Sequence, residues 1–302
     1  MGIRGVFRSI LPANSSRSSG GSDQLTVPDN RANIPFDNSY KWLWVNMEKL
    51  MGDPVAAKRP HYVWGVLQGA ALGKVLGLER VSVIEVGVAG GAGLLAMESA
   101  VEHCERLVDI KIDVYGFDTG VGVPKPIDYR DTPYKWSEGY YPCDMSALKK
   151  RLRRAQLRIG LLKDSIPAFT KQLPAPIAFV GFDTGMYTGT KDAMHLFDAG
   201  HGLLIPRLPC SFRSAVGKDV TEFGGELLAI SECNSTHESR KLSRIPGLTY
   251  FVPAKYCGWW IEMMYCLHVF DHPLYGNPDA YEQSAVIDLD DKEEFHAVNK
   301  RR

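Results

Sequence analysis

The sequence predicts an α/β protein with a doubly wound, mostly parallel sheet of seven strands and an N-terminal helical cap. Apolar runs rich in β-branched residues alternate with stretches of helical period from residue 81 onward, as in sheets covered on both faces. The first run, at 81–86, leads into a glycine-rich turn and then an apolar helical pattern. Several runs end on an acid, which predicts a row of carboxylates at one edge of the sheet.

The chain divides into four predicted segments. Residues 1–30 contain a Ser- and Gly-rich stretch and are expected to form a disordered tail. Residues 31–78 are expected to form the cap, with amphipathic helices at 40–50 and 61–78. The sheet domain is predicted over 79–275, and a C-terminal tail over 276–302.

Within the domain, strands and helices are predicted in alternation. The strands are expected at 82–86, 111–117, 157–162, 177–182, 202–205, 248–252 and 262–270. The helices are expected at 94–104, 145–155, 190–197 and 221–231. The long segment 119–144, rich in Pro, Gly and aromatic residues, is predicted to be a lid or binding loop. The basic run at 149–154 is expected to be a solvated helix face.

Composition narrows the classes of function. The 302 residues include 35 Lys and Arg and 35 Asp and Glu, so the formal net charge is zero. This balance gives no support for a nucleic-acid or polybasic membrane partner. The six cysteines form no C-x-x-C pair, which favours reduced thiols in a cytoplasmic protein over a zinc site or a disulfide framework. No apolar run is long enough to predict a membrane span.

The glycine turn after the first strand predicts a small-molecule site. Glycines permit a sharp turn and a close approach of the backbone to a ligand, and the following helix start offers free N–H groups. The glycine register differs from G-x-G-x-x-G, which disfavours a nicotinamide oxidoreductase. An acid at the strand tip suits a cationic amine, so S-adenosylmethionine is the expected ligand; a turn without a ligand is the alternative. The residues expected to bind it are Glu85, Gly87, Ala89, Gly90, Gly91 and Gly93.

Acids at the ends of later strands extend this predicted site. Asp118 follows the second strand and is expected to accept hydrogen bonds from the ribose hydroxyls. Asp164 and Ser165 follow the third strand and are expected at the adenine. Asp183 follows the fourth and is expected beside the transferred methyl group. A helix cap or a turn is the alternative role for each acid.

Three segments resemble a known family. Residues 84–93 (IEVGVAGGAG), 114–124 (VYGFDTGVGVP) and 177–197 (IAFVGFDTGMYTGTKDAMHLF) are similar to class I S-adenosylmethionine-dependent methyltransferases of the macrocin and mycinose sugar O-methyltransferase type. The resemblance spans roughly residues 60–235, and the run YTGTKDA at 187–193 is its most specific part. It implies a Rossmann-like methyltransferase fold for 79–275, S-adenosylmethionine as the cofactor and a small-molecule hydroxyl acceptor.

The resemblance also implies a divalent cation, which the residues of this chain do not support. The family's cation is held by the acid after the fourth strand and by an acid pair after the fifth. Asp183 supplies the first acid, but Gly185 stands where a second is common, and 209–214 (PCSFRS) contains no acid. A magnesium site usually needs near-ideal octahedral oxygen geometry, so one carboxylate is a poor site. The metal ligands therefore stay unassigned, and little or no magnesium dependence is expected.

A hydroxyl acceptor must lose a proton during methyl transfer, which requires a base when no metal is present. Asp183 is the first candidate, and His272, in the turn after the last strand, is the second; a structural role is the alternative for this histidine. Two functions stay open at this point. One is an O-methyltransferase acting on a sugar or another small hydroxylated metabolite, and the other is a non-catalytic S-adenosylmethionine-binding protein with a degenerate site. The oligomeric state also stays open, a homo-oligomer included.

Overall fold

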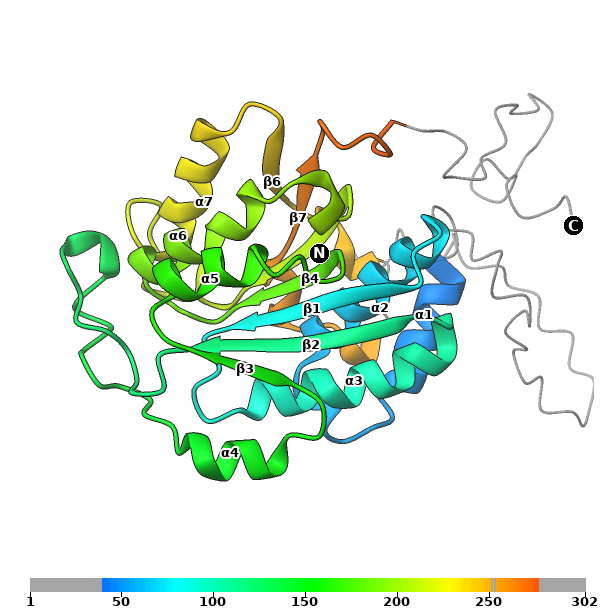
Figure 1. Ribbon diagram of the computed structural model, residues 1–302, viewed down its shortest axis with the longest axis horizontal. Coiled ribbons are helices and arrows are strands. Elements are labelled where there is room, and N and C mark those ends of the chain that lie inside the picture. Colours follow the sequence, from blue (N-terminus) through cyan, green and yellow to red (C-terminus); the bar gives the residue numbers. More distant parts are fainter. Residues whose placement is uncertain (1–39, 251, 253, 277–302) are drawn as a thin grey trace, which may run out of the picture.

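The computed structural model describes residues 40–250, 252 and 254–276, and the two predicted tails lie outside these residues apart from Gly276. The predicted fold class is confirmed. One sheet of seven strands has the order β3-β2-β1-β4-β5-β7-β6, and β7 runs antiparallel to both of its neighbours (Figure 1). The strands are β1 Arg80–Val86, β2 Lys111–Asp118, β3 Gln156–Ile159, β4 Ile177–Phe182, β5 Arg207–Phe212, β6 Arg240–Arg244 and β7 Met264–Val269.

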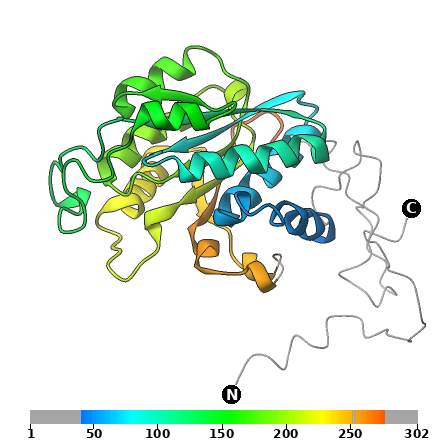
Figure 2. The ribbon, with the colours of Figure 1, turned by 90° about the horizontal axis from the view of Figure 1, so that it is seen from below.

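Helices cover both faces of the sheet. On one face α2 and α3 pack against each other, and α3 crosses the front of the molecule in Figure 2; on the other face α6 packs against both α5 and α7. β1 and β4 are buried along almost their whole length because they lie between these two layers. The helices are α1 Tyr40–Leu50, α2 Pro60–Val75, α3 Ala92–Val108, α4 Met145–Arg151, α5 Leu162–Thr170, α6 Tyr187–Ala193 and α7 Gly225–Thr236.

The second helix of the predicted cap is part of the core. Gly65, Gly69 and Gly73 of α2 face the sheet, and a Cβ atom on Gly69 would lie only 1.8 Å from the carbonyl oxygen of Ala178 in β4. The absence of side chains at these positions lets α2 approach the strands directly. This close packing fixes the start of α2 next to the ends of β4 and β5, where the site described below is built.

Two predicted strands are wrong. The run 202–205 is mostly a 3-10 turn with one isolated bridge, and 248–250 is another 3-10 turn. The fifth strand is β5, in which Pro209 gives a weak strand signal, and the sixth is β6, whose sequence RKLSR is polar because it lies at the sheet edge. β5 pairs with β4 and β7, and β6 pairs with β7; this pairing overrides local propensity.

The cysteines form no disulfide bond in the structure. All six cysteines are free thiols. Within the described part of the chain, no helix is both long enough and apolar enough to cross a bilayer.

Candidate functional site

The carboxyl ends of β1, β2 and β4 meet at one point of the sheet edge. The N–H of Gly87 donates to the carbonyl of Phe117 at 2.8 Å, and the N–H of Asp183 donates to the carbonyl of Val86 at 2.8 Å. Gly87 has φ +88°, and a Cβ atom there would lie 2.5 Å from the carbonyl oxygen of Asp183. The chain therefore needs glycine at this position to bring the glycine turn and Asp183 together.

The other residues of the turn have different roles. Gly91 starts α3 with φ +79°, and its Cα faces Leu148 of α4; Gly93 lies against the carboxyl group of Glu85. Ala89 has φ +44°, an uncommon conformation for a residue with a side chain. Gly90 alone has no atom within 4 Å of a Cβ built on it, so the turn is open there. Packing therefore explains Gly91 and Gly93, whereas Gly90 leaves space.

Asp118, at the end of β2, holds the glycine turn in place. Its Oδ2 accepts hydrogen bonds from the N–H groups of Val88 and Ala89, both at 2.9 Å, and its Oδ1 accepts from Gly120 at 2.7 Å. A carboxylate with several backbone donors is firmly oriented. The ribose contact expected of Asp118 stays a prediction, and the side chain already lies beside the turn.

Asp164 and Ser165 lie in α5, which follows β3. Asp164 is exposed in the first turn of this helix, and the Oγ of Ser165 is buried without a hydrogen-bond partner among the described residues. Their adenine contact stays a prediction. The position of Asp164 also fits the alternative of an acid near a helix N-terminus.

Glu85 lies under the turn and not at the open edge where the sequence analysis expected it. Its side chain is 1% exposed, and its Oε1 accepts a hydrogen bond from the hydroxyl of Tyr62 at 2.7 Å. Burial raises the pKa of Glu85 to about 8, and the charge of Asp183 adds to this effect. The carboxyl group is therefore mostly neutral near pH 7.

Asp183 directly follows β4 and faces a cation from the next strand. Arg213 directly follows β5, and its Nε lies 3.6 Å from Oδ1 of Asp183, whose side chain is partly exposed. Burial raises the pKa of Asp183 to about 6, although the positive charges of Arg213 and Arg59 lower it. Met186, and not Asp183, occupies the N-cap position of α6, so the helix-cap alternative does not hold. Asp183 is a carboxylate poised to change protonation near neutral pH.

Glu226 is a site residue that sequence reasoning missed. It belongs to α7 and is 1% exposed; its carboxyl group accepts hydrogen bonds from the N–H of Gly185 at 3.3 Å and of Ser214 at 2.7 Å. It thereby joins the turn after β4 to the turn after β5. Burial raises the pKa of Glu226 to about 8, and the charge of Asp183 contributes. Only the tertiary fold brings this helical residue to the sheet edge, and no local motif signals it.

Because Glu226 binds its proton more tightly when folded, the pH dependence of stability is predictable in sign. The unfolded chain releases this proton near pH 4.5, whereas the folded protein keeps it until about pH 8. The contribution to the free energy of unfolding is full below pH 4.5 and falls as the pH rises to about 8. We expect Glu226→Gln to flatten the fall in Tm between pH 5 and pH 8.5, measured by thermal melts.

Glu232→Gln on the same helix is the matched control for this prediction. Lys191 and Tyr187 lower the pKa of Glu232, so its removal should not flatten the curve. A Glu226→Gln curve parallel to that of the unmodified protein would contradict the buried, protonated state of Glu226.

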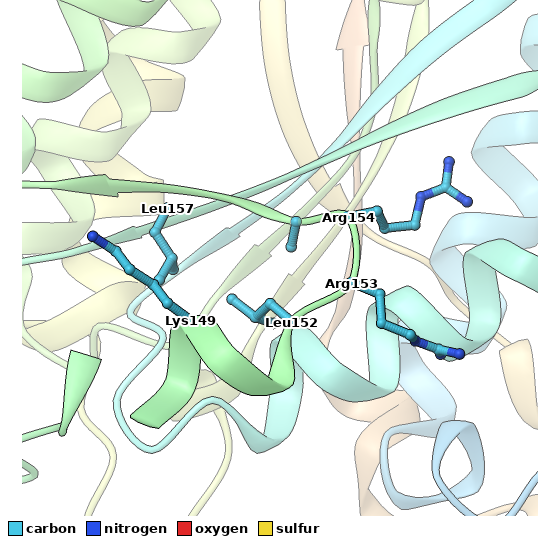
Figure 3. Close-up of a pocket in the computed structure, with 6 residues that line it drawn as sticks. Lys149, Leu152, Arg153, Arg154 and Leu157 are labelled. Carbon is cyan, nitrogen blue, oxygen red and sulfur yellow. The ribbon is translucent and has the colours of Figure 1, made fainter. Parts of the chain in front are cut away.

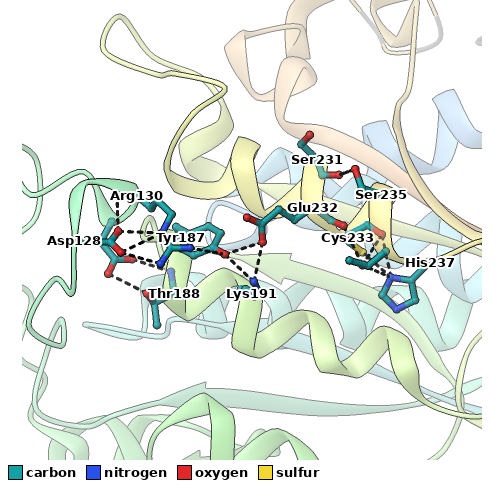
Figure 4. A network of polar contacts seen from close by, with 12 residues as sticks. Asp128, Arg130, Tyr187, Thr188, Lys191, Ser231, Glu232, Cys233, Ser235 and His237 are labelled. Carbon is teal, nitrogen blue, oxygen red and sulfur yellow. Dashed lines mark hydrogen bonds and ion pairs between the residues drawn. The ribbon is translucent and has the colours of Figure 1, made fainter.

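The predicted lid segment 119–144 is anchored on α6. Asp131 is 0% exposed and accepts hydrogen bonds from the N–H and the hydroxyl of Thr188 at 2.7 and 2.9 Å. The guanidinium of Arg130 lies 4.8 Å from the ring centroid of Tyr187, whose hydroxyl donates to Glu232 (Figure 4). The run at 187–193 therefore serves to dock this loop.

The docked loop covers the turn after Asp183. A Cβ atom on Gly185, which has φ +72°, would lie 2.1 Å from Cζ2 of Trp136. The indole of Trp136 therefore packs directly on this glycine, and its Nε1 is buried without a partner among the described residues. Tyr134 also ties the loop to Asp219 by donating its hydroxyl to that carbonyl at 2.8 Å. The loop therefore covers Gly185, in the turn that follows Asp183.

The assignment of His272 to the catalytic site is wrong. β7 runs antiparallel to β5, with His268 opposite Arg207, and the N–H of Val269 donates to the carbonyl of Pro206. The turn that contains His272 therefore lies beside the start of β5, whereas Asp183 follows the end of β4. The two side chains are at opposite edges of the sheet. The antiparallel direction of β7, which the sequence does not reveal, places His272 at the far edge.

A cavity of about 270 Å³ lies elsewhere, between α4 and the start of β3 (Figure 3). The basic run at 149–154 contributes much of its lining, and Arg154 turns away to pair with Glu105 at 2.8 Å. Lys149, Lys150 and Arg151 are exposed, in agreement with the predicted solvated face. This cavity contains none of the predicted site residues. Its lining residues are Lys149, Leu152, Arg153, Arg154, Ala155 and Leu157.

Comparisons with known proteins give distant similarities only. No protein-family model matches the sequence, and no curated protein matches it. Among solved structures, the chain is similar to the calicheamicin methyltransferase CalS11, at 18% identity over 77% of this chain and 96% of that chain, with a TM-score of 0.45. It is also similar to the methyltransferase PaMTH1 of Podospora anserina, at 14% identity over 76% and 88% of the two chains, with a TM-score of 0.38. An O-methyltransferase from Bacillus cereus is 14% identical over 74% and 89%, with a TM-score of 0.33.

Proposed function

We propose that the protein is an S-adenosylmethionine-dependent O-methyltransferase that acts on a sugar or another small hydroxylated metabolite. One observation carries this proposal: the backbone of Asp183 packs against Gly87 of the glycine turn, and its partly exposed carboxylate follows directly at the carboxyl edge of the sheet. Ligands of doubly wound sheets bind at this edge. A methyl donor held at the glycine turn and an acceptor hydroxyl at Asp183 would lie side by side, as methyl transfer requires.

The residues at the turn fit the proposed cofactor. Gly90 leaves open space in front of the start of α3, and Asp118 is oriented beside it. In α5, which follows β3, the buried Oγ of Ser165 has no hydrogen-bond partner among the described residues. The turn that holds S-adenosylmethionine would be shaped by Gly87, Ala89, Gly91 and Gly93, and Asp164 would lie on the adenine side. When bound, the cofactor supplies an electrophilic methyl group on a sulfonium. Glu85 would support the turn from below.

The chemistry left to the chain is alignment, deprotonation and exclusion of water. Asp183 would accept the proton of the acceptor hydroxyl; its pKa of about 6 leaves it ionised at neutral pH yet basic enough for this task. Arg213 would keep the carboxylate ionised before the acceptor arrives. Trp136, packed on Gly185, would exclude water from the same side. The missing metal-binding acids were the reason for the non-catalytic alternative. If Asp183 is the base, the reaction needs no metal, and that reason no longer applies.

The residues present do not fit a magnesium ion. Asp183 faces the cation Arg213, and the carboxyl group of Glu226 already binds two backbone N–H groups. Among the described residues, no group of three His, Cys, Asp or Glu side chains is arranged to hold a metal ion. We therefore assign no step of the reaction to a divalent cation.

Methyl transfer is accordingly expected to persist without magnesium. Turnover should change by less than about twofold when a chelator is added, because Asp183 and not a metal accepts the proton. The measurement is product formation with and without EDTA, with magnesium added back. Loss of nearly all activity on chelation, restored by magnesium, would show that the proposal has the wrong base.

Cofactor binding itself is tested at Asp118. Asp118→Ala removes the acceptor of three backbone hydrogen bonds and the expected ribose contact, so the affinity for S-adenosylmethionine should fall by about 1–3 kcal/mol. Calorimetric titration measures this loss. Asp113→Ala is the matched control, because Asp113 lies earlier on β2 and pairs with Arg80. Equal affinity in the two variants, with both folded, would remove Asp118 from the site.

A further inference from the structure

Two arginines near Asp183 leave hydrogen-bond donors without a partner among the described residues. Arg213 lies 3.6 Å from Asp183, beyond hydrogen-bond distance, and its guanidinium makes no hydrogen bond within the part of the chain that the structure describes. Arg59, at the N-cap of α2, has a buried Nε that likewise has no partner among the described residues. A buried guanidinium N–H without a hydrogen-bond partner, such as the Nε of Arg59, is costly, and such groups are normally satisfied by a partner or a ligand.

Arg59 and Arg213 are far apart in the sequence but lie at the same edge of the sheet. α2 packs against β4, β5 and the 3-10 helix at Trp259–Met263. Tyr62, in the first turn of α2, packs on Gly181 near the end of β4, so Arg59 at the N-cap of α2 lies at the edge of the sheet where Arg213 faces Asp183. The charges of both arginines accordingly lower the pKa of Asp183 and of the buried His61. His61 is neutral there, and its Nδ1 also has no partner among the described residues.

An exposed aromatic face completes this location. The guanidinium of Arg213 lies 4.9 Å from the ring centroid of Trp259, which is 57% exposed. This stacking fixes the plane of the guanidinium and leaves its edge free to donate hydrogen bonds. Arg59 and Arg213 place two positive charges near the carboxylate of Asp183, whereas the buried carboxyl groups of Glu85 and Glu226 are mostly protonated near neutral pH.

We propose that this cluster of Arg59, Arg213 and Trp259 is an acceptor subsite that binds an anionic group, a carboxylate or a phosphate, on the molecule whose hydroxyl faces Asp183. This inference rests on the proposed function, and it narrows the acceptor to an anionic hydroxylated metabolite. The planar fork of an arginine matches both anions by paired hydrogen bonds. The excess positive charge would also favour such an acceptor over a neutral one.

Matched sugars test the subsite. Glucose, glucose 1-phosphate and glucuronate are titrated calorimetrically into the full chain in the presence of S-adenosylhomocysteine. We expect at least one charged sugar to bind roughly ten-fold or more tightly than glucose, the effect of a charge-assisted hydrogen-bond pair. The phosphate and carboxylate arms distinguish the two anions. Equal affinities for charged and neutral sugars, or no measurable binding of either charged sugar, would overturn the proposal.

Variants assign the preference to the two arginines. Arg213→Gln and Arg59→Gln should each reduce the preference to about twofold, whereas Arg80→Gln should keep it, because Arg80 pairs with Asp113 at the start of β1, at the opposite edge. If Arg213→Gln does not fold, Arg213→Lys keeps the charge and loses the fork, and an intermediate preference is expected. A preference that survives in both folded glutamine variants would contradict the subsite.

A separate titration with S-adenosylmethionine keeps the two proposals distinguishable. Cofactor binding without a preference for charged sugars overturns the subsite alone. Absence of cofactor binding overturns the proposed function, and the charged-sugar preference, measured without cofactor, then decides the subsite independently.

Discussion

Gly87→Ala is expected to destabilise the protein strongly and to abolish S-adenosylmethionine binding. The added Cβ atom would lie 2.5 Å from the carbonyl oxygen of Asp183 and 2.8 Å from its carbonyl carbon, and the backbone has φ +88°. Two packed strand ends must then separate, because no flexible side chain can yield. Strain and overpacking together should lower the free energy of unfolding by about 2–5 kcal/mol.

Gly90→Ala, three residues later, is the matched control. A Cβ atom on Gly90 meets nothing within 4 Å, so the melting temperature should stay within about 2 °C of the unmodified protein. Differential scanning fluorimetry of the two variants, followed by cofactor titration of whichever folds, makes the comparison. If Gly87→Ala melts like Gly90→Ala and still binds the cofactor, the close approach of the turn to Asp183 is wrong.

Asp183→Asn is expected to slow methyl transfer by about 10²–10⁴, the usual contribution of a general base. The amide cannot accept the hydroxyl proton, whereas it keeps the size of the carboxylate. Affinity for S-adenosylmethionine should stay within a few-fold, because the glycine turn and Asp118 are unchanged. Single-turnover product formation with a saturating acceptor measures the rate.

Two further readouts make this test specific to catalysis. Asp192→Asn in α6 is the matched control and should leave turnover unchanged, since Asp192 lies in the helix beyond the turn. In the unmodified enzyme kcat/KM should rise with pH through an apparent pKa near 6, the value to which burial raises Asp183. Unaltered turnover in Asp183→Asn would remove this residue from the mechanism.

The central strands and the glycine turn could be predicted from sequence because their signals are local. β1, β2 and β4 are apolar runs that end on or just before the site residues, and their buried positions follow from that composition. β5 and β6 could not be found in this way. β5 contains Pro209 and β6 is polar; β5 owes its conformation to pairing with β4 and β7, and β6 to pairing with β7.

The site was predictable only where it lies on the strands. Asp118 and Asp183 come directly from strand ends, whereas Arg59 and Tyr62 come from α2 and Glu226 comes from α7. Helical residues reach a sheet edge through packing, which no motif reports. His272 was misassigned for a related reason: the antiparallel direction of β7 carries it to the opposite edge.

The most direct test of the central claim is a calorimetric titration of the unmodified protein with S-adenosylmethionine and, under the same conditions, with NADH. One equivalent of S-adenosylmethionine should bind, and NADH should not, because the glycine register and the carboxylates at the strand ends suit a cationic ligand and repel a pyrophosphate. The account predicts that Gly87→Ala abolishes this binding, whereas Gly90→Ala leaves the protein folded. Absence of S-adenosylmethionine binding, or binding of NADH in its place, would contradict the account.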